Sequence, residues 1–276
     1  MLLAFLGTVF AADAVVVPFE ELPSGHLVVP CTIDGHGPYR FVVDTGANAF
    51  VIDPDVAKEL GIDLAKVPHQ KAHAADGAPI SVPVVELRDV RLGTRVLRRT
   101  TSVVTDVDAL VGESDVLGIL SKDMFAGDRL EVHFPGHELR VLDTHDDANA
   151  LPLVRLRGGL SGVRLSNGLT VILDLGADIS VLNSAGAALL GAVQAEPLAG
   201  EAAGLTGAIE TRAWVTLPPL DLGDPTPGGV VPVVDLGLFD VLRLHDEPAL
   251  LLGVDQMQDR VLAIDYGAKT VSLRVP

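Results

Sequence analysis

Short apolar runs bounded by glycine, proline or acidic residues dominate the chain. Residues 26–33 and 39–43 are typical of two strands, and the segment 35–38 between them is typical of a turn. Residues 79–106 and 208–234 are also rich in strand patterns. The distribution of hydrophobic and polar positions therefore predicts a mostly β protein.

Two short helices interrupt the strand pattern, and both carry start and stop signals. Asp53 is placed to cap the first helix, Pro54 suits its first position, and Gly61 follows its end. Asn183 and Gly191 take the corresponding places around the second helix. The sequence predicts no longer helix than these.

Two tetrads, Asp44-Thr45-Gly46-Ala47 and Asp174-Leu175-Gly176-Ala177, each follow an apolar run and lie 130 residues apart. A comparison of residues 41–104 with residues 171–234 gives seventeen identities without a gap. The shared glycines matter most, because glycine marks positions of unusual backbone conformation or close approach. The chain is therefore predicted to be a tandem duplication of one β unit.

A second repeated block follows with a different spacing. Residues 116–119 resemble residues 251–254, and hairpin patterns follow at 129–142 and 260–275. The two repeated blocks and the two hairpins together predict two similar lobes. A lobe of residues 15–143, a polar linker at 144–151 and a second lobe of residues 152–276 are expected.

Composition narrows the functional classes. The chain has 276 residues, a hydrophobic content of 48% and a net charge of −17, which argues against binding to nucleic acid or to an anionic membrane surface. No apolar stretch is long enough to span a membrane. Cys31 is the only cysteine, so an intramolecular disulfide and a cysteine-based zinc site are both excluded.

Residues 1–14 form a short apolar stretch that ends in small residues. This composition resembles a secretory signal peptide, so export to the periplasm or the medium is expected. The alternative is a buried first strand.

The two tetrads, the later repeated block and the closing hairpins together resemble the retropepsin-like aspartic peptidases, including bacterial relatives. In that family one unit is a small closed β-barrel, and two copies each supply one aspartate. The resemblance implies two similar acid-protease lobes related by a pseudo-two-fold axis on one chain, as in the pepsin arrangement. It also implies an active monomer that needs no cofactor or metal.

The same resemblance assigns roles to individual residues. Asp44 and Asp174 are the expected catalytic pair, which shares one proton and activates a water. The remaining tetrad residues are expected to support this pair: Thr45, Gly46, Ala47, Leu175, Gly176 and Ala177. Peptide-binding positions are expected next to the tetrads and in two flap hairpins: Asn48, Asp178, Asp76, Gly77 and Gly207.

Leu175 departs from the family pattern. The family has threonine or serine at this position, and its hydroxyl bonds across the floor of the site to the opposite copy. Thr45 retains a hydroxyl and Leu175 does not, so Thr45 lacks a buried partner unless the backbone or a water supplies one. Pepsin-like enzymes often have serine or threonine at the places of Ala47 and Ala177, and that hydroxyl stabilises the charged pair. Its absence from both lobes predicts a mildly acidic pH optimum of activity.

Three functions remain open at this point. The first is an aspartic endopeptidase that cleaves extended peptides. The second is a catalytically weak or inactive relative that binds peptides in the same groove. The third is a scaffold in which both aspartates are structural turn residues, which the cost of burying two carboxyl groups together disfavours. His69 and His73 have a zinc-ligand spacing but lack a third ligand, so no metal site is expected.

Overall fold

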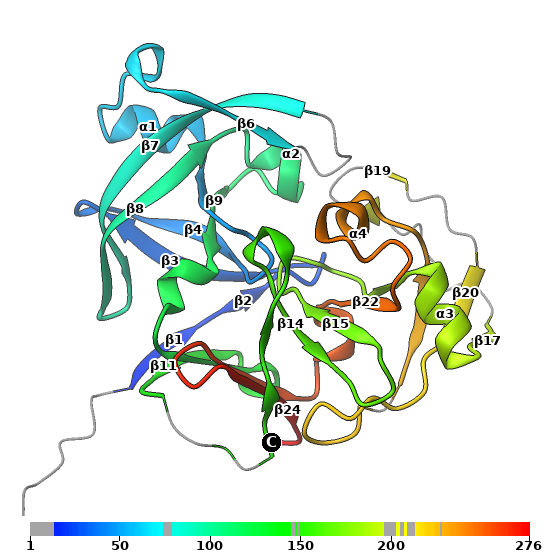
Figure 1. Ribbon diagram of the computed structural model, residues 1–276. Helices are drawn as coiled ribbons and strands as arrows, with labels where there is room; N and C mark the ends of the chain where they lie inside the picture. The colour runs from blue at the N-terminus through cyan, green and yellow to red at the C-terminus, as the bar shows by residue number, and fades with distance from the viewer. Residues whose placement is uncertain are drawn as a thin grey trace, which may run out of the picture.

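The computed structural model describes residues 14–73, 79–144, 147, 149–195, 203–204, 207–208, 213–226 and 228–276. Two groups of strands lie side by side, and a further sheet lies below both in Figure 1. The predicted mostly-β fold of two similar lobes with short helices is confirmed. Most of the expected leader, residues 1–13, lies outside the described residues, as do Asp76 and Gly77 of the first expected flap.

The first lobe is an eight-stranded sheet in the order β2-β3-β4-β9-β5-β8-β7-β6. An additional pairing of β3 with β7 closes six of these strands into a barrel. The strands are β2 (Glu20–Glu21), β3 (Leu27–Ile33), β4 (His36–Asp44), β5 (Phe50–Ile52), β6 (His69–His73), β7 (Pro79–Leu92), β8 (Arg95–Val104) and β9 (Val116–Ser121).

The second lobe repeats this strand order as β13-β14-β15-β22-β16-β21-β20-β17. Each strand has a counterpart in the first lobe, and both lobes contain the same two parallel pairs. The strands are β13 (Val154–Arg155), β14 (Ser161–Arg164), β15 (Thr170–Leu173), β16 (Val181–Leu182), β17 (Val193–Gln194), β20 (Ala213–Thr216), β21 (Val230–Val233) and β22 (Ala249–Leu252).

The two predicted helices form with the predicted caps. The side chain of Asp53 accepts from the N–H of Asp55 at the start of α1 (Pro54–Glu59). The side chain of Asn183 accepts from the N–H of Gly186 at the start of α3 (Ser184–Leu190). Two further short helices, α2 (Asp108–Val111) and α4 (Gly237–Leu242), precede β9 and β22. In the described part of the chain, no helix is long and apolar enough to cross a membrane.

A six-stranded sheet joins the two halves in the order β1-β11-β10-β23-β24-β12. The predicted hairpins are confirmed, but β10 pairs with β23, so the two hairpins form one shared sheet across the lobes. The strands are β1 (Val15–Pro18), β10 (Arg129–His133), β11 (Glu138–Leu142), β12 (Leu151–Pro152), β23 (Val261–Asp265) and β24 (Thr270–Arg274). The division at 144–151 stays a prediction, and the shared sheet takes strands from both sides of it.

One repeat alignment was wrong by three residues. Val51 pairs with Ile119 in the first lobe, and its counterpart Val181 pairs with Leu251 in the second. Ile119 therefore corresponds to Leu251, and Gly253 corresponds to Ser121 rather than to Gly118. The sequence comparison matched two glycines with different roles, because strand pairing rather than local composition sets the register.

The first predicted turn was also misplaced. Asp34 and Gly35 both have positive φ values, of 51° and 81°, and they connect β3 directly to β4. Such a two-residue Asp-Gly turn matches the twist of paired strands, so the strand begins at His36 instead of Tyr39.

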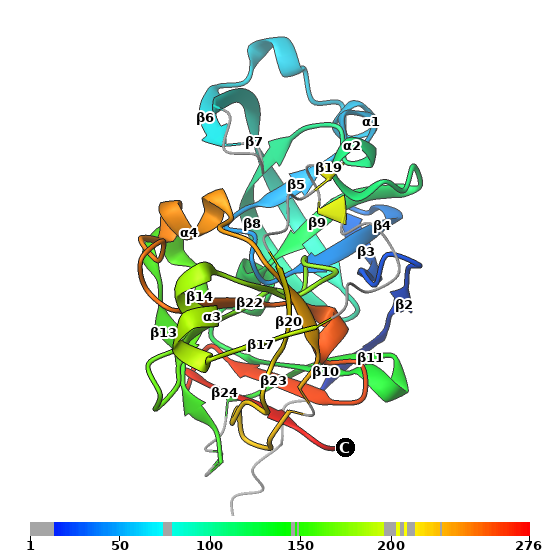
Figure 2. The ribbon, with the colours of Figure 1, turned by 90° about the vertical axis from the view of Figure 1, so that its right-hand side faces the viewer.

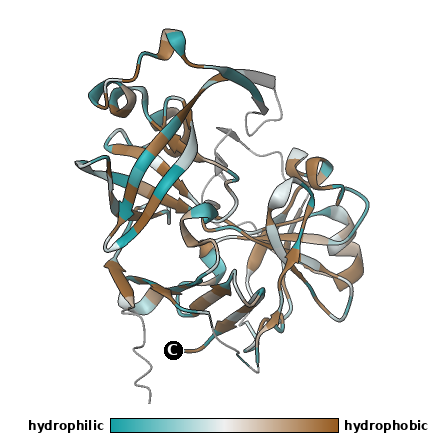
Figure 3. Ribbon diagram, turned by 60° about the vertical axis from the view of Figure 1, so that its left-hand side comes forward, coloured by the Kyte–Doolittle hydropathy of each residue, from teal (hydrophilic) through white to brown (hydrophobic). Residues whose placement is uncertain are grey.

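The core extends through both lobes and under the site. Hydrophobic segments run through the strands of both lobes in Figure 3. One cluster of buried side chains includes Phe41 and Phe50 of the first lobe and Leu173 and Leu250 of the second. The ends of β4 and β15, which carry the two tetrads, thus rest on a continuous apolar base. Figure 2 shows the shared sheet on the side of the molecule away from the first lobe.

Candidate active site

The two tetrad aspartates meet between the lobes. Asp44 ends β4, and Asp174 directly follows β15. A Cβ atom added at Gly46 would lie 2.6 Å from the carboxyl group of Asp174, and one added at Gly176 would lie 2.4 Å from Cγ of Asp44. Each carboxyl group therefore lies against the glycine of the opposite lobe, at a distance that only glycine permits.

The two carboxyl groups lie close enough for each to act on the pKa of the other. An ionised carboxylate only accepts, so a hydrogen bond between them requires a proton on one of the two groups. Burial, followed by the charge of Asp174, raises the pKa of Asp44 well above its usual range. Burial also raises the pKa of Asp174, against the opposing effects of the Gly176 N–H, the neighbouring Asp44 carboxyl group, the Gly46 N–H and the charge of His26. The pair thus retains one proton over a wider pH range than a free carboxyl group does, and it titrates as a unit.

The backbone holds the two carboxyl groups in different ways. The N–H of Ala47 donates to Oδ1 of Asp44 at 2.8 Å, whereas the N–H of Gly176 donates to Oδ1 of Asp174 at 2.9 Å. Ala177 instead donates its N–H to the main-chain carbonyl of Asp174. Neither alanine side chain offers a hydroxyl, so backbone N–H groups stabilise the charged form.

Thr45 connects the lobes beneath the two aspartates. Its hydroxyl donates to the carbonyl of Leu173 at 3.0 Å and accepts from the N–H of Leu175 at 3.0 Å. The main chain of the second lobe thus supplies the partner that the Leu175 side chain cannot offer, which is the backbone alternative that the sequence left open. The side chain of Leu175 is fully buried in the apolar core, so the second lobe makes no equivalent hydroxyl contact.

The expected substrate positions are only partly placed. Asn48 follows the first tetrad, is exposed, and accepts from Nζ of Lys122 at 2.5 Å. Asp178 is half-buried and accepts from the N–H of Ile179, and burial raises its pKa against the charge of His26. Gly207 pairs with Gly204 in the hairpin of β18 (Ala203–Gly204) and β19 (Gly207–Ala208), the expected second flap. Its role in covering a substrate stays a prediction.

His26 is a site residue that the sequence analysis missed. It is buried, and its Nε2 lies 3.2 Å from the carbonyl of Gly176, while Nδ1 lies 2.9 Å from Oγ of Ser24. A carbonyl cannot donate, so Nε2 carries a proton toward Gly176. A histidine of the first lobe therefore holds the tetrad loop of the second. A lone histidine at the start of a strand gave no signal of this contact.

Gly253, which directly follows β22, packs against the loop after Asp174, and its lack of a side chain allows this close contact. A Cβ atom there would lie 2.7 Å from the carbonyl oxygen of Ala177 and 2.8 Å from the carbonyl carbon of Ile179. The N–H of Gly253 donates to Oγ of Ser180, which itself donates to Asp255 at 2.7 Å. The loop behind Asp174 is therefore fixed by close backbone packing and by a short side-chain network.

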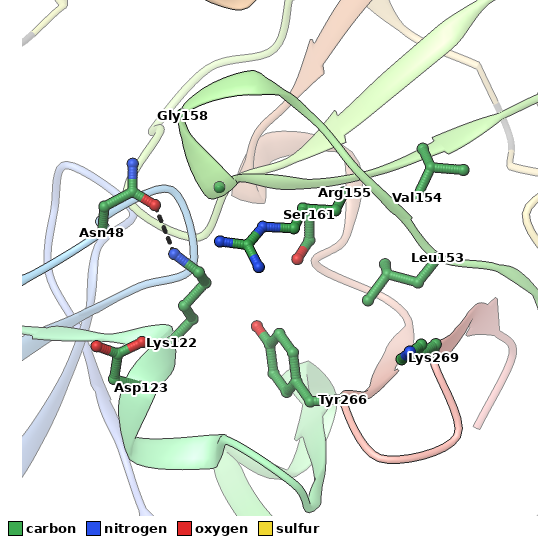
Figure 4. A pocket seen from close by; sticks show the side chains of 11 residues that line it. Asn48, Lys122, Asp123, Leu153, Val154, Arg155, Gly158, Ser161, Tyr266 and Lys269 are labelled. Carbon is green, nitrogen blue, oxygen red and sulfur yellow. Dashed lines mark hydrogen bonds between the residues drawn. The ribbon is translucent and has the colours of Figure 1, made fainter.

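A cavity of about 530 Å³ lies beside the first tetrad, between the two lobes. Asn48 and Lys122 line it from the first lobe, and Arg155 and Tyr266 line it from the second half of the chain. Figure 4 shows these side chains around one space. The charge of Asp44 acts on the pKa of both Lys122 and Tyr266, so the cavity lies close to the aspartate pair. In the described residues, no group of three or more His, Cys, Asp or Glu side chains could hold a metal ion.

Comparisons with known proteins give one family match and similar solved structures. Residues 29–124 match the family described as aspartyl protease. The chain is similar to a solved retropepsin-like aspartic protease from Rickettsia conorii, with 16% identity, a TM-score of 0.37, and coverage of 48% of this chain and 91% of that one. It is also similar to basic 7S globulin from soybean, with 12% identity, a TM-score of 0.52 and coverage of 95% of both chains. No curated protein matches the chain.

The resemblance to retropepsin-like aspartic peptidases is therefore confirmed. The family match covers most of the first lobe, including Asp44 and its tetrad. The likeness to the soybean protein extends over nearly the whole chain and, at 12% identity, shows the two-lobe fold alone. Activity has to be argued from the site itself.

Proposed function

We propose that the protein is an aspartic endopeptidase that hydrolyses peptide bonds at Asp44 and Asp174. The observation that carries this proposal is the packing of each carboxyl group against the opposite tetrad glycine. Such packing brings two partly buried carboxyl groups together from two lobes. A structural role does not explain this placement, because burying two acidic groups side by side is costly.

The chemistry follows from the shared proton. The ionised carboxylate removes a proton from a water, and the water oxygen attacks the carbonyl carbon of the substrate. The protonated carboxyl group donates its proton to the carbonyl oxygen, giving a neutral tetrahedral diol. Proton transfer to the amide nitrogen then breaks the carbon–nitrogen bond, and the products are a carboxylic acid and an amine. No cofactor or metal enters these steps.

Both aspartates belong to one chain, so the proposed active form is a monomer. The proposed substrate is an extended segment of a peptide or protein that binds between the lobes. Export of the protein, expected from residues 1–14, also belongs to this proposal. The raised pKa values of both aspartates favour an optimum that is only mildly acidic, because activity needs one ionised carboxylate. An optimum below about pH 3 would contradict this reasoning.

A catalytically weak peptide-binding protein is the second candidate. Leu175 favours it, because only one lobe supplies the hydroxyl that links the two tetrad loops. A groove held by one link instead of two could bind a peptide without fixing the carboxyl groups well enough for catalysis. The two candidates share the groove and differ only in turnover.

Cleavage of an unfolded protein separates these candidates. The wild type, Asp44→Asn and Asp174→Asn would be incubated with a reduced, unfolded substrate at pH values between about 3 and 7, and fragments would be identified by mass spectrometry. Cleavage by the wild type that is lost in both variants is the expected result. A folded wild type without cleavage at any pH would reject the peptidase and favour the peptide-binding protein.

A further inference from the structure

The cavity beside the first tetrad has an unusual charge for this protein. Lys122, Arg155 and Lys269 line it, and Asp123 is the only carboxylate in the lining. The chain as a whole carries a net charge of −17. A cationic cavity of about 530 Å³ therefore forms within a strongly acidic molecule.

Two of these cations face the same space without an anion between them. Figure 4 shows the side chains of Lys122 and Arg155 converging, with Lys269 beyond Tyr266. Arg155 and Lys269 form no ion pair with any residue that the structure describes. Burial lowers the pKa of Lys122, the negative charges of Asp123 and Asp44 oppose this shift, and the positive charge of Arg155 adds to it. An anion in this space would relieve the repulsion between the two side chains.

Tyr266 adds an unused hydrogen-bond donor. Its hydroxyl oxygen is buried and has no hydrogen-bond partner among the described residues. In Figure 4 the hydroxyl points toward Arg155 and Lys122. A buried hydroxyl without a partner is costly, and an acceptor bound in the cavity would satisfy it.

The opposite side of the aspartate pair shows that the fold does not require these cations. By the strand register, Asn48 corresponds to Asp178, Lys122 to Val254, and Arg155 to Glu21. The equivalent positions on the other side are thus acidic or apolar. The pseudo-two-fold symmetry of the backbone is kept, while the charge on the two sides differs in sign.

We propose that this cavity is a substrate subsite that binds a carboxylate of the peptide near the scissile bond. The carboxylate is either an Asp or Glu side chain or the C-terminus of the peptide. Arg155 offers a planar fork that suits a carboxylate, Lys122 offers a second charge, and the hydroxyl of Tyr266 offers a neutral donor. This inference rests on the proposed peptidase function, and it places a preference for acidic substrates on the Asn48 side of the site.

Matched peptides test the subsite. Peptides based on a wild-type cleavage site would carry Glu at each position in turn, with Gln counterparts, and each would be made with a free or an amidated C-terminus. At one position kcat/KM is expected to be about tenfold higher for Glu than for Gln. A preference for the free C-terminus instead would assign the site to a terminal carboxylate. No preference for any carboxylate would overturn the inference.

Variants of two nearby arginines, Arg155 and Arg157, test whether the cavity causes the carboxylate preference. Arg155→Gln is expected to remove the carboxylate preference, and Arg155→Glu is expected to shift it toward a Lys-containing peptide. Arg157→Gln is the matched control, because Arg157 lies two residues away, is exposed, and does not line the cavity. An equal loss of preference in Arg157→Gln would mean that overall charge, rather than the subsite, causes it, and would overturn the inference.

Binding of the same peptides, measured by fluorescence anisotropy, separates this inference from the proposed function. Carboxylate-selective binding without cleavage would reject the peptidase and keep the subsite. Cleavage without carboxylate selectivity would reject the subsite and keep the peptidase. Failure of both binding selectivity and cleavage would reject both.

Discussion

The hydroxyl of Thr45 provides the sharpest test of how the two lobes are held together. It is 1% exposed, and its two hydrogen bonds reach the carbonyl of Leu173 and the N–H of Leu175 in the other lobe. Thr45→Val keeps the shape of the side chain and removes both bonds. The substitution leaves one buried carbonyl and one buried N–H without their partner.

The expected cost follows from these two groups. Each buried backbone group that loses its partner costs about 1–3 kcal/mol, so Thr45→Val should lower the free energy of unfolding by about 2–6 kcal/mol. Thr45→Ser keeps the hydroxyl and loses one methyl group, which costs about 1 kcal/mol. The difference between the free energies of unfolding of the two variants therefore measures the hydrogen bonds separately from the lost packing.

Urea unfolding followed by tryptophan fluorescence would measure both variants against the wild type, because Trp214 is the only tryptophan. With a slope of about 3 kcal/mol per M, the midpoint of Thr45→Val should fall by about 0.7–2 M. Thr45→Ser should stay within about 0.5 M of the wild type. Equal midpoints for Val and Ser would refute the claim that this hydroxyl links the lobes.

Three further predictions follow from the site. The raised pKa of Asp44 means that the folded protein binds a proton more tightly than the unfolded chain, so the free energy of unfolding of the wild type falls as pH rises above about 4. Asp44→Asn removes this titration, so its stability relative to the wild type should increase from pH 4 to pH 7. Thermal unfolding at both pH values checks this, and a stability difference that does not grow with pH contradicts it. Leu175→Thr should raise kcat several-fold by adding a second cross-lobe hydroxyl, while the lost apolar packing lowers stability by about 2–3 kcal/mol; an unchanged kcat in a folded variant would reject the idea that Leu175 limits activity. Gly46→Ala should abolish cleavage, because its Cβ would overlap the carboxyl group of Asp174, whereas Gly136→Ala, with its nearest neighbour at 3.9 Å, should leave cleavage unchanged; cleavage by Gly46→Ala would contradict the close packing of the pair.

Local signals in the sequence predicted local structure well. Asp53 and Asn183 cap the two helices as expected, because a capping side chain and the N–H groups it binds are close in sequence. The tetrads were also visible, because an aspartate followed by a glycine at the end of an apolar run occurs twice with constant spacing. The meeting of Asp44 with Asp174 then follows from duplication and from the family resemblance.

Contacts between distant segments could not be predicted in the same way. The pairing of β10 with β23 depends on how the two lobes face each other, which no local pattern encodes. The same holds for the link from His26 to Gly176, which spans 150 residues, and for the convergence of Lys122 and Arg155. A single polar residue in a strand or turn carries no mark of the partner that it meets in the folded protein.

The central claim is that Asp44 and Asp174 act as one unit in peptide hydrolysis. The most direct test is a cycle of cleavage rates for the wild type, Asp44→Asn, Asp174→Asn and the double variant on one peptide. Residues that act as a unit are strongly non-additive, so the double variant should be about as slow as either single variant. If each substitution lowers the rate independently and the double variant multiplies the two losses, or if either single variant retains the wild-type rate, the two aspartates do not form one catalytic pair.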